Sequence, residues 1–157
     1  MADFERRIEM TYEEVKILLV EDDEIDVLAT KKALRDLKIA NPLLEAQNGI
    51  EALDLLRGEN GAEKLLQPYI ILLDLNMPQM GGLEFLDNIR HDEELKSSIV
   101  FVMSTSEAEA DIWAAYEQNI AGYIVKSNTK DSFQNAMSML EHYWRIIEMP
   151  DKSIYIK

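Results

Sequence analysis

Several polar side chains follow directly on apolar segments of the sequence, and they are of the types that bind metals and phosphoryl groups. They are Glu21, Asp22 and Asp23 after KILLV, Asp74 after YIILL, Ser104, Thr105 and Ser106 after IVFVM, and Lys126 after GYIV. Carboxylates that lie close together repel one another unless a cation neutralises them, and Mg²⁺ suits this role because it prefers oxygen ligands. A carboxylate can also attack phosphorus to form an aspartyl phosphate, whose oxygens lysine and hydroxyl groups can neutralise. The pattern predicts a phosphoryl-transfer site around Asp74.

The apolar segments alternate with longer segments of helical spacing, which is typical of a parallel sheet with helices on both faces. The expected strands are Ile17–Val20, Leu43–Ala46, Tyr69–Leu73, Ile99–Met103 and Tyr123–Val125. The expected helices are Ile25–Leu37, Ile50–Leu66, Gly82–Ile89, Ala108–Asn119 and Lys130–Ile147. Ligands of such sheets bind outside the carboxyl ends of the strands. We therefore expect Asp22, Ser104 and Lys126 to lie around Asp74 at one edge.

Length and composition indicate one domain. The chain has 157 residues, of which 47% are hydrophobic, and we expect a domain at 15–148 with an extension at 1–14 and a tail at 149–157. The absence of cysteine excludes disulfides and thiolate metal sites. No segment approaches the roughly 20 apolar residues of a membrane span, and the N-terminus lacks the apolar part of a secretory signal. The net charge of -14 disfavours binding to nucleic acid or membranes, so we expect a cytoplasmic protein with protein partners.

Four motifs carry a resemblance to a known family. ILLVEDD, IILLDLNMPQMGGLEFL, IVFVMSTSE and GYIVK, in this order, resemble the receiver domain of two-component response regulators. The resemblance runs from about Lys16 to Glu148, and the segments STSEAEADI, VKSNTKDSF and EHYW are similar to the subgroup of cyanobacterial phytochrome response regulators. It implies a flavodoxin-like, doubly wound sheet of five parallel strands in the order 2-1-3-4-5, with five helices.

The resemblance also implies roles for individual residues. Asp74 would be the phosphoacceptor. The Mg²⁺ ligands would be Glu21, Asp22, Asp74 and the backbone carbonyl of Asn76. Lys126 and Ser104 would contact the phosphoryl group, and Ser104 and Tyr123 would form the switch. Asn76 and Ser106 would influence the rate of autodephosphorylation.

Three positions depart from the usual family pattern. Ser127 follows Lys126 where proline is common, although the phytochrome-related subgroup also has serine there. Ser104 stands where threonine is frequent, and it keeps the hydroxyl donor but lacks the methyl group, so a looser switch is expected. Gly81 stands where aspartate is common.

The implied function is that of a stand-alone response regulator, a signalling protein whose only reactions are self-catalysed phosphoryl transfer and autodephosphorylation. A sensor histidine kinase, of the phytochrome type, or a phosphotransfer protein would phosphorylate it. The change would reach the face formed by the fourth helix, the fifth strand and the fifth helix. Only MPDKSIYIK follows Glu148, so output is expected through protein contacts. If Trp113, Tyr116 and Tyr123 share a face, that face would bind a partner or form a homodimer.

Simpler interpretations of these residues remain open. The acidic run could be a solvated turn that caps the first helix, and for Asp23 capping and ligation are equally open. One hydroxyl of the run 104–106 is expected to cap the next helix, with Thr105 or Ser106 favoured over Ser104.

The aromatic side chains could equally be packing residues: Tyr123 could belong to the core or sheet, and Trp113 and Tyr116 to the core. His91 and His142 are expected at the surface, and neither is a convincing phosphodonor.

Two other functions compete with the response regulator. A pseudo-receiver scaffold would not need the complete set of acidic residues, hydroxyl and lysine. A haloacid-dehalogenase-like phosphatase also has a nucleophilic aspartate and Mg²⁺, but it expects a second aspartate two residues later, where Asn76 stands.

Overall fold

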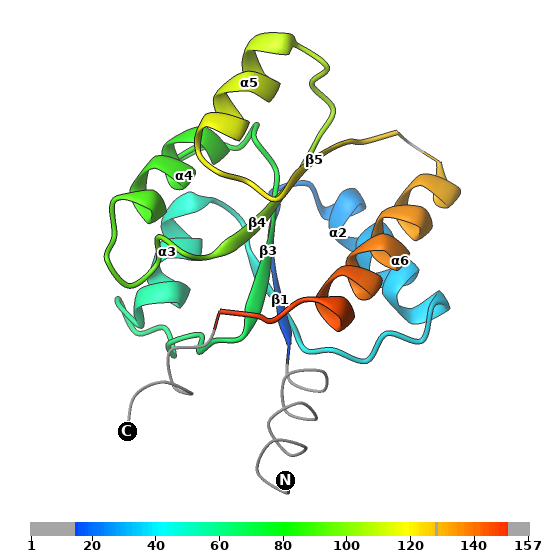
Figure 1. Cartoon of the computed structure of the whole chain (residues 1–157), viewed down its shortest axis with the longest axis horizontal. Helices are drawn as coiled ribbons and strands as arrows, with labels where there is room; N and C mark the ends of the chain where they lie inside the picture. The colour runs from blue at the N-terminus through cyan, green and yellow to red at the C-terminus, as the bar shows by residue number, and fades with distance from the viewer. Residues whose placement is uncertain (1–14, 128, 151–157) are drawn as a thin grey trace, which may run out of the picture.

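The computed structural model describes residues 15–127 and 129–150, which form one parallel sheet with helices on both faces (Figure 1). The strands are β1 (Lys16–Val20), β2 (Leu43–Ala46), β3 (Tyr69–Leu73), β4 (Ile99–Ser104) and β5 (Gly122–Val125). The helices are α2 (Glu24–Asp36), α3 (Gly49–Arg57), α4 (Gly82–Arg90), α5 (Glu109–Glu117) and α6 (Lys130–Ile146). The strand order is β2-β1-β3-β4-β5 with every pair parallel, which confirms the flavodoxin-like fold. The expected extension at 1–14 and part of the expected tail, 151–157, lie outside the described residues.

The central strands are buried on both faces, which explains their continuous apolar sequences. Their side chains alternate between two cores, with Leu18, Val20, Ile71 and Leu73 in one and Ile17, Leu19, Ile70 and Leu72 in the other. The first core lies against α3 and α4, and the second lies against α2 and α6 (Figure 1). The sheet is therefore held from both sides, and the side chains of β3 are all buried.

The helix expected over Lys130–Ile147 is confirmed as α6, and it is amphipathic. Its buried side chains form one stripe, made of Phe133, Ala136, Met137, Leu140 and Trp144. Trp144 is only 1% exposed and is among the largest fully buried side chains. Within the described part of the chain, no helix is both long and apolar enough to cross a membrane.

The helix predicted over Ile50–Leu66 is wrong in its second half, because α3 ends at Arg57. Gly58 follows in the left-handed conformation, with φ 68°, and its N–H bonds to the carbonyl of Asp54. Gly61 is also left-handed, with φ 83°. Glycine adopts this conformation at little cost, so the helix stops here and the chain returns through a loop to β3. The apolar residues after Gly58 had suggested a continuing helix.

The side chain of Arg90, the last residue of α4, joins the loops at the amino ends of two strands. Its guanidinium donates hydrogen bonds to the carbonyls of Lys96, Ser98, Gln118 and Asn119, at 2.7 to 3.1 Å. The first two residues precede β4 and the other two precede β5. One side chain thus connects two loops on the edge of the sheet opposite to the predicted site.

Candidate functional site

The predicted site residues converge at the carboxyl edge of the sheet. The sheet hydrogen bonding continues past the strands, because the N–H of Asp74 donates to the carbonyl of Val20 (3.0 Å) and that of Lys126 to the carbonyl of Ser104 (2.8 Å). The N–H of Glu21 likewise donates to the last residue of β2, at 2.9 Å. The positions of these residues are therefore set by the rigid sheet rather than by loops.

Three carboxylates lie together at this edge. One oxygen from each of Glu21, Asp22 and Asp74 lies within 4.8 Å of the others. Glu21 is 5% exposed and Asp74 is 8% exposed, whereas Asp22 is exposed to solvent. Two buried carboxylates beside an open one repel each other in the absence of a counter-charge, so this oxygen donor set fits a hard divalent cation.

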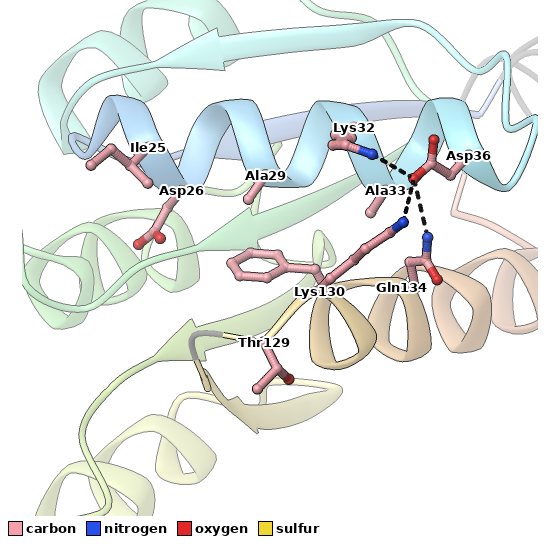
Figure 2. A pocket seen from close by; sticks show the side chains of 10 residues that line it. Ile25, Asp26, Ala29, Lys32, Ala33, Asp36, Thr129, Lys130 and Gln134 are labelled. Carbon is pink, nitrogen blue, oxygen red and sulfur yellow. Dashed lines mark hydrogen bonds and ion pairs between the residues drawn. The ribbon is translucent and has the colours of Figure 1, made fainter.

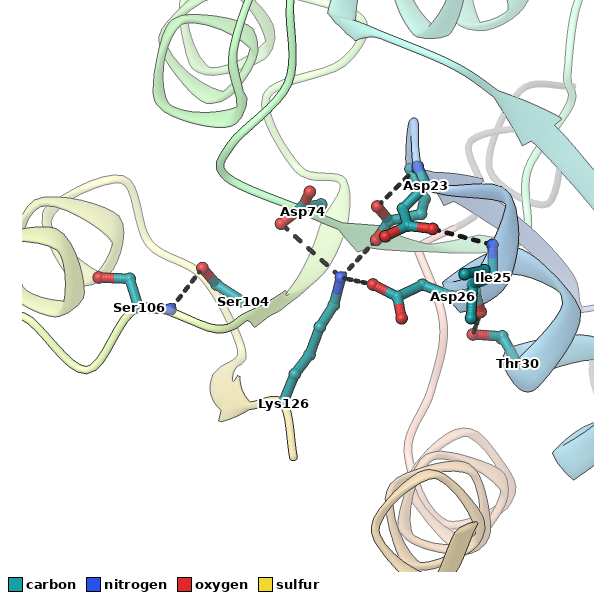
Figure 3. A network of polar contacts seen from close by, with 9 residues as sticks. Asp23, Ile25, Asp26, Thr30, Asp74, Ser104, Ser106 and Lys126 are labelled. Carbon is teal, nitrogen blue, oxygen red and sulfur yellow. Dashed lines mark hydrogen bonds and ion pairs between the residues drawn. The ribbon is translucent and has the colours of Figure 1, made fainter. Parts of the chain in front are cut away.

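Lys126 reaches into the same cluster (Figure 3). Its Nζ lies 2.5 Å from Oε2 of Glu21, 3.0 Å from Oδ2 of Asp26 and 3.8 Å from Oδ1 of Asp74. The lysine side chain is only 6% exposed. The first two contacts are hydrogen bonds, whereas the distance to Asp74 is that of an ion pair without one.

Burial raises the pKa of two carboxyls of the cluster. Burial raises the pKa of Glu21 to about 7, against the lowering effect of its hydrogen bond with Lys126. Burial also raises the pKa of Asp74, which Lys126 partly offsets. Burial disfavours the charged form of Lys126, but its hydrogen bonds with Glu21 and Asp26 outweigh this and raise its pKa. The lysine therefore stays charged as the internal counter-ion.

Asp26 is the acidic group that the sequence interpretation missed. It lies in the first turn of α2, and its side chain returns toward Lys126 (Figure 3). The hydroxyl of Thr30 donates to the backbone carbonyl of Asp26 at 2.9 Å, and Thr30 is 2% exposed. Little in the sequence pointed to it, since Glu21 and Asp22 precede α2 and helical spacing does not relate them to Asp26.

The open question about Asp23 is answered by the structure. Asp23 is the N-cap of α2, and its Oδ1 accepts a hydrogen bond from the N–H of Ile25 at 2.9 Å. Its own N–H donates to Oε1 of Glu21 at 3.2 Å. It is not a member of the three-carboxylate group. Capping is thus the role that the geometry gives to Asp23.

Ser104 and Tyr123 meet at the loop between β4 and α5. The hydroxyl of Ser104, which is 0% exposed, accepts a hydrogen bond from the N–H of Ser106 at 3.1 Å. The hydroxyl of Tyr123 donates to the carbonyl of Ser106 at 2.9 Å, so both predicted switch residues are linked to one loop residue. Tyr123 is half-buried rather than a plain core residue.

The prediction that a hydroxyl of this loop caps α5 is wrong. The N-cap is Ala108, which makes no side-chain capping bond. Ser106 instead donates its hydroxyl to Oδ2 of Asp111 at 2.6 Å and accepts from the N–H of Ala108 at 3.2 Å. The hydroxyl of Ser106 therefore stabilises the loop ahead of the helix rather than the free N–H groups of its first turn.

The interpretation of Trp113 and Tyr116 as core residues is also wrong, because they are 70% and 48% exposed. They lie three residues apart on α5 and so share a face of that helix. The hydroxyl of Tyr116 accepts a hydrogen bond from the N–H of Tyr123 at 3.3 Å, and the indole of Trp113 donates to Glu117 at 2.9 Å. The side chains of His91 and His142 are exposed, as expected.

The loop after Asp74 packs tightly against the start of α4, the helix that follows it. Asn76 is exposed, and its backbone N–H is hydrogen-bonded to the carboxylate of Asp74. The N–H of Gly82 donates to the carbonyl of Leu75 at 3.0 Å. A Cβ at Gly82 would lie 2.6 Å from the carbonyl oxygen of Asp74, closer than real Cβ contacts allow. A residue without a side chain is therefore required where α4 approaches Asp74.

A groove between α2 and α6 opens beside the site (Figure 2). Its volume is about 240 Å³, and Asp26 is one of its lining residues. At the far end of the groove Asp36 accepts hydrogen bonds from Lys32 (3.1 Å) and Gln134 (3.2 Å), and it pairs with Lys130 at 3.8 Å. Asp26 thus belongs both to the groove wall and to the lysine network.

A flavodoxin-like sheet with a buried acidic cluster and a lysine at its carboxyl edge places this chain among the α/β proteins whose ligand site lies outside the ends of the strands. Residues 17–138 match the model of the response regulator receiver domain. The chain therefore belongs to this family, the receiver domains of two-component signalling, which confirms the resemblance seen in the sequence.

Several relatives share most of the chain. It is 36% identical over 129 residues to the response regulator Rcp1 of Synechocystis sp. (strain ATCC 27184 / PCC 6803 / Kazusa), covering 82% of this chain and 87% of Rcp1. The phosphorylated cyanobacterial phytochrome response regulator RcpA has a TM-score of 0.80 at 33% identity, over 88% of this chain and 99% of RcpA. The Mn²⁺-bound form of Rcp1 has a TM-score of 0.77 at 32% identity, over 87% of this chain and 99% of that one. The chain is thus similar to phytochrome response regulators.

Proposed function

We propose that Asp74 accepts a phosphoryl group from the phosphohistidine of a sensor histidine kinase or phosphotransfer protein. The observation that carries this proposal is the cluster itself: Asp74 directly follows a central strand, shares a group of three carboxylates and has Lys126 3.8 Å away. A carboxylate oxygen of Asp74 attacks phosphorus, the P–O bond forms, and the P–N bond breaks with its electron pair returning to the imidazole. Lys126 pairs with the charged phosphoryl oxygens, and the hydroxyl of Ser104 donates a hydrogen bond to them.

The resident cation in this proposal is Mg²⁺, held by Glu21, Asp22, Asp74 and the backbone carbonyl of Asn76. It supplies positive charge for the phosphoryl oxygens. The donor set supports this choice because all its side-chain ligands are carboxylates, two of them buried. The Mn²⁺-bound form of Rcp1, at 32% identity, is a further support.

The conformational change passes through Ser106, to which both Ser104 and Tyr123 are hydrogen-bonded. When the hydroxyl of Ser104 turns to the phosphoryl group, the N–H of Ser106 loses its acceptor and the β4–α5 loop shifts. The hydrogen bond of Tyr123 with that loop then breaks. Because Tyr123 also contacts Tyr116, the change reaches the exposed α5 surface that carries Trp113, where a protein partner or a second copy of the chain binds.

A phytochrome-like kinase in the cytoplasm is the partner that the relatives support, since RcpA is described as a phytochrome response regulator. A pseudo-receiver scaffold is less well supported, because the acidic residues, the hydroxyl and the lysine all lie at one edge. The phosphatase alternative lacks its second aspartate at Asn76.

The experiment is incubation with acetyl phosphate and Mg²⁺, followed by intact mass. The wild type should gain one phosphoryl group, and the gain should disappear with a chelator or in Asp74→Ala. Asp54→Ala is a matched control, since Asp54 lies on α3 and is not one of the clustered carboxylates. A wild type without an adduct, or an adduct that survives Asp74→Ala, contradicts the proposal.

Mg²⁺ should raise the melting temperature more at about pH 8 than at about pH 5. With a pKa of about 7, the folded protein binds the Glu21 proton more tightly than an ordinary glutamate of pKa 4.5 does. The stabilisation by this proton is complete below the pKa of the ordinary glutamate and is lost as pH rises through the pKa of Glu21 in the folded protein. The free energy of unfolding falls by on the order of 3 kcal/mol over this range. Mg²⁺ offsets the loss by neutralising the carboxylates.

Calorimetric scans with and without Mg²⁺ at both pH values measure this effect. In Glu21→Gln the pH dependence of the metal-free melting temperature should become smaller. An equal or larger Mg²⁺ effect at the lower pH would count against the metal site.

A further inference from the structure

We propose that Asp26 is a positioning residue that holds the ammonium group of Lys126 away from Asp74, so that it competes with a phosphoryl group for this lysine. The inference rests on the proposed function of Asp74. It concerns a residue outside the three clustered carboxylates.

The ammonium group of Lys126 is hydrogen-bonded to groups other than Asp74. An ammonium group has three N–H donors, and Lys126 uses two of them on Glu21 (2.5 Å) and Asp26 (3.0 Å). The 3.8 Å between its Nζ and Asp74 exceeds hydrogen-bond length. The ammonium therefore has one donor left for a phosphoryl group on Asp74, and a movement toward that group would weaken its present bonds to Glu21 and Asp26.

Asp26 is positioned to maintain its hydrogen bond with Lys126. The amino end of α2 stabilises a negative charge in the first turn, and Thr30 anchors the backbone of Asp26 from one turn further along. The side chain of Asp26 is 21% exposed and that of Lys126 is 6% exposed, so solvent screens their attraction only in part.

A bound cation would affect Glu21 and Asp26, the two hydrogen-bond partners of Lys126, differently. Glu21 belongs to the group of carboxylates that would hold Mg²⁺, and its charge is then neutralised. Asp26 lies outside that group, so the cation would not be coordinated by it. With the cation bound, Asp26 is the group that competes with the phosphoryl oxygens for Lys126.

The affinity of the site for a phosphoryl group should therefore rise when Asp26 loses its charge. In Asp26→Asn at saturating Mg²⁺, the phosphoryl mimic beryllofluoride should bind roughly three- to tenfold more tightly than in the wild type. Asp26→Glu keeps a carboxylate within reach of the lysine and should restore an affinity close to that of the wild type. Fluoride titration at constant beryllium, followed by ¹⁹F NMR, measures these affinities.

Asp23→Asn is the matched control. It removes the same charge three residues away, and asparagine caps a helix as well as aspartate does. The change in beryllofluoride affinity in Asp23→Asn measures the general influence of net charge on binding. If Asp26→Asn does not fold, Asp26→Ser removes the same carboxylate and carries the same expectation.

Tighter binding in Asp26→Asn than in both Asp23→Asn and Asp26→Glu is the expected result. Equal or weaker binding in Asp26→Asn than in Asp23→Asn overturns the role of Asp26 while leaving the proposed function intact. A wild type that does not bind beryllofluoride in the presence of Mg²⁺ overturns the proposed function itself. The two failures are thus distinguishable.

Discussion

Replacing Lys126 by methionine will slow phosphorylation by acetyl phosphate by roughly a hundredfold or more. The variant lacks the positive charge that lies closest to Asp74 among the described contacts, and methionine fills the same space without charge. The transition state places negative charge on the phosphoryl oxygens, and this charge would be left without its lysine partner. The rate is measured by intact mass over time at saturating Mg²⁺.

The same variant will lose stability in a pH-dependent way. Removing the lysine leaves Glu21 and Asp74 buried without a counter-charge, which costs about 3 kcal/mol near neutral pH. Lys126 lowers the pKa of both carboxyls, so in its absence these pKa values rise further. Protonation relieves the repulsion, so the loss should shrink as pH falls below these values.

Lys130→Met is the control for both measurements. Lys130 is 64% exposed and pairs with Asp36 at 3.8 Å, on the surface of α6. We expect unchanged phosphorylation and a change in stability within about 0.5 kcal/mol. If Lys126→Met were phosphorylated as fast as Lys130→Met, Lys126 would have no role in phosphoryl transfer.

Gly82→Ala will destabilise the domain by about 3 kcal/mol and will also slow phosphorylation. The new Cβ would lie 2.6 Å from the carbonyl oxygen of Asp74 and 2.7 Å from Cα of Leu75. Both are backbone atoms and cannot turn aside as a flexible side chain can. Either α4 or the segment that carries Asp74 must therefore shift. Urea unfolding measures the loss of stability.

The adjacent Gly81→Ala separates this clash from the general effect of removing a glycine. A Cβ at Gly81 would meet the carbonyl of Leu75 at 3.3 Å, and Gly81 has φ -68°, which alanine adopts without strain. We expect a change in stability of less than about 1 kcal/mol. Similar losses in the two variants would show that the approach of α4 to Asp74 is not the cause.

The convergence of the acidic residues at one edge could be predicted from the sequence for a physical reason, whereas the strand order was implied by the resemblance to the receiver family. Parallel strands all present their carboxyl ends at one edge, so Glu21, Asp74 and Lys126 must meet once the strands are recognised. The continuous apolar sequences of β1, β3 and β4 made those strands recognisable.

The errors have a different origin. Apolar residues beyond Gly58 look helical when only their spacing is considered, but the left-handed turn at Gly58 ends α3. Ser106 is a good capping residue by type, yet its hydroxyl bonds to Asp111. Asp26 was missed because spacing along a helix does not say which neighbouring strand end its side chain will reach. The glycines Gly58 and Gly61 were a stop signal for the first case, whereas the other two depend on packing that a single sequence does not reveal.

The hydrogen bonds of Arg90 determine how the sheet can respond to a change at Asp74. Four carbonyls from the loops before β4 and β5 are bonded to one guanidinium, at the edge opposite to the carboxylates. The amino ends of these two strands are therefore anchored to each other and to α4. A displacement that begins at Ser104 cannot slide β4 lengthwise past β5. We expect the displacement to be taken up instead by the β4–α5 loop, which begins next to Ser104 and lies at the edge of the sheet opposite to Arg90.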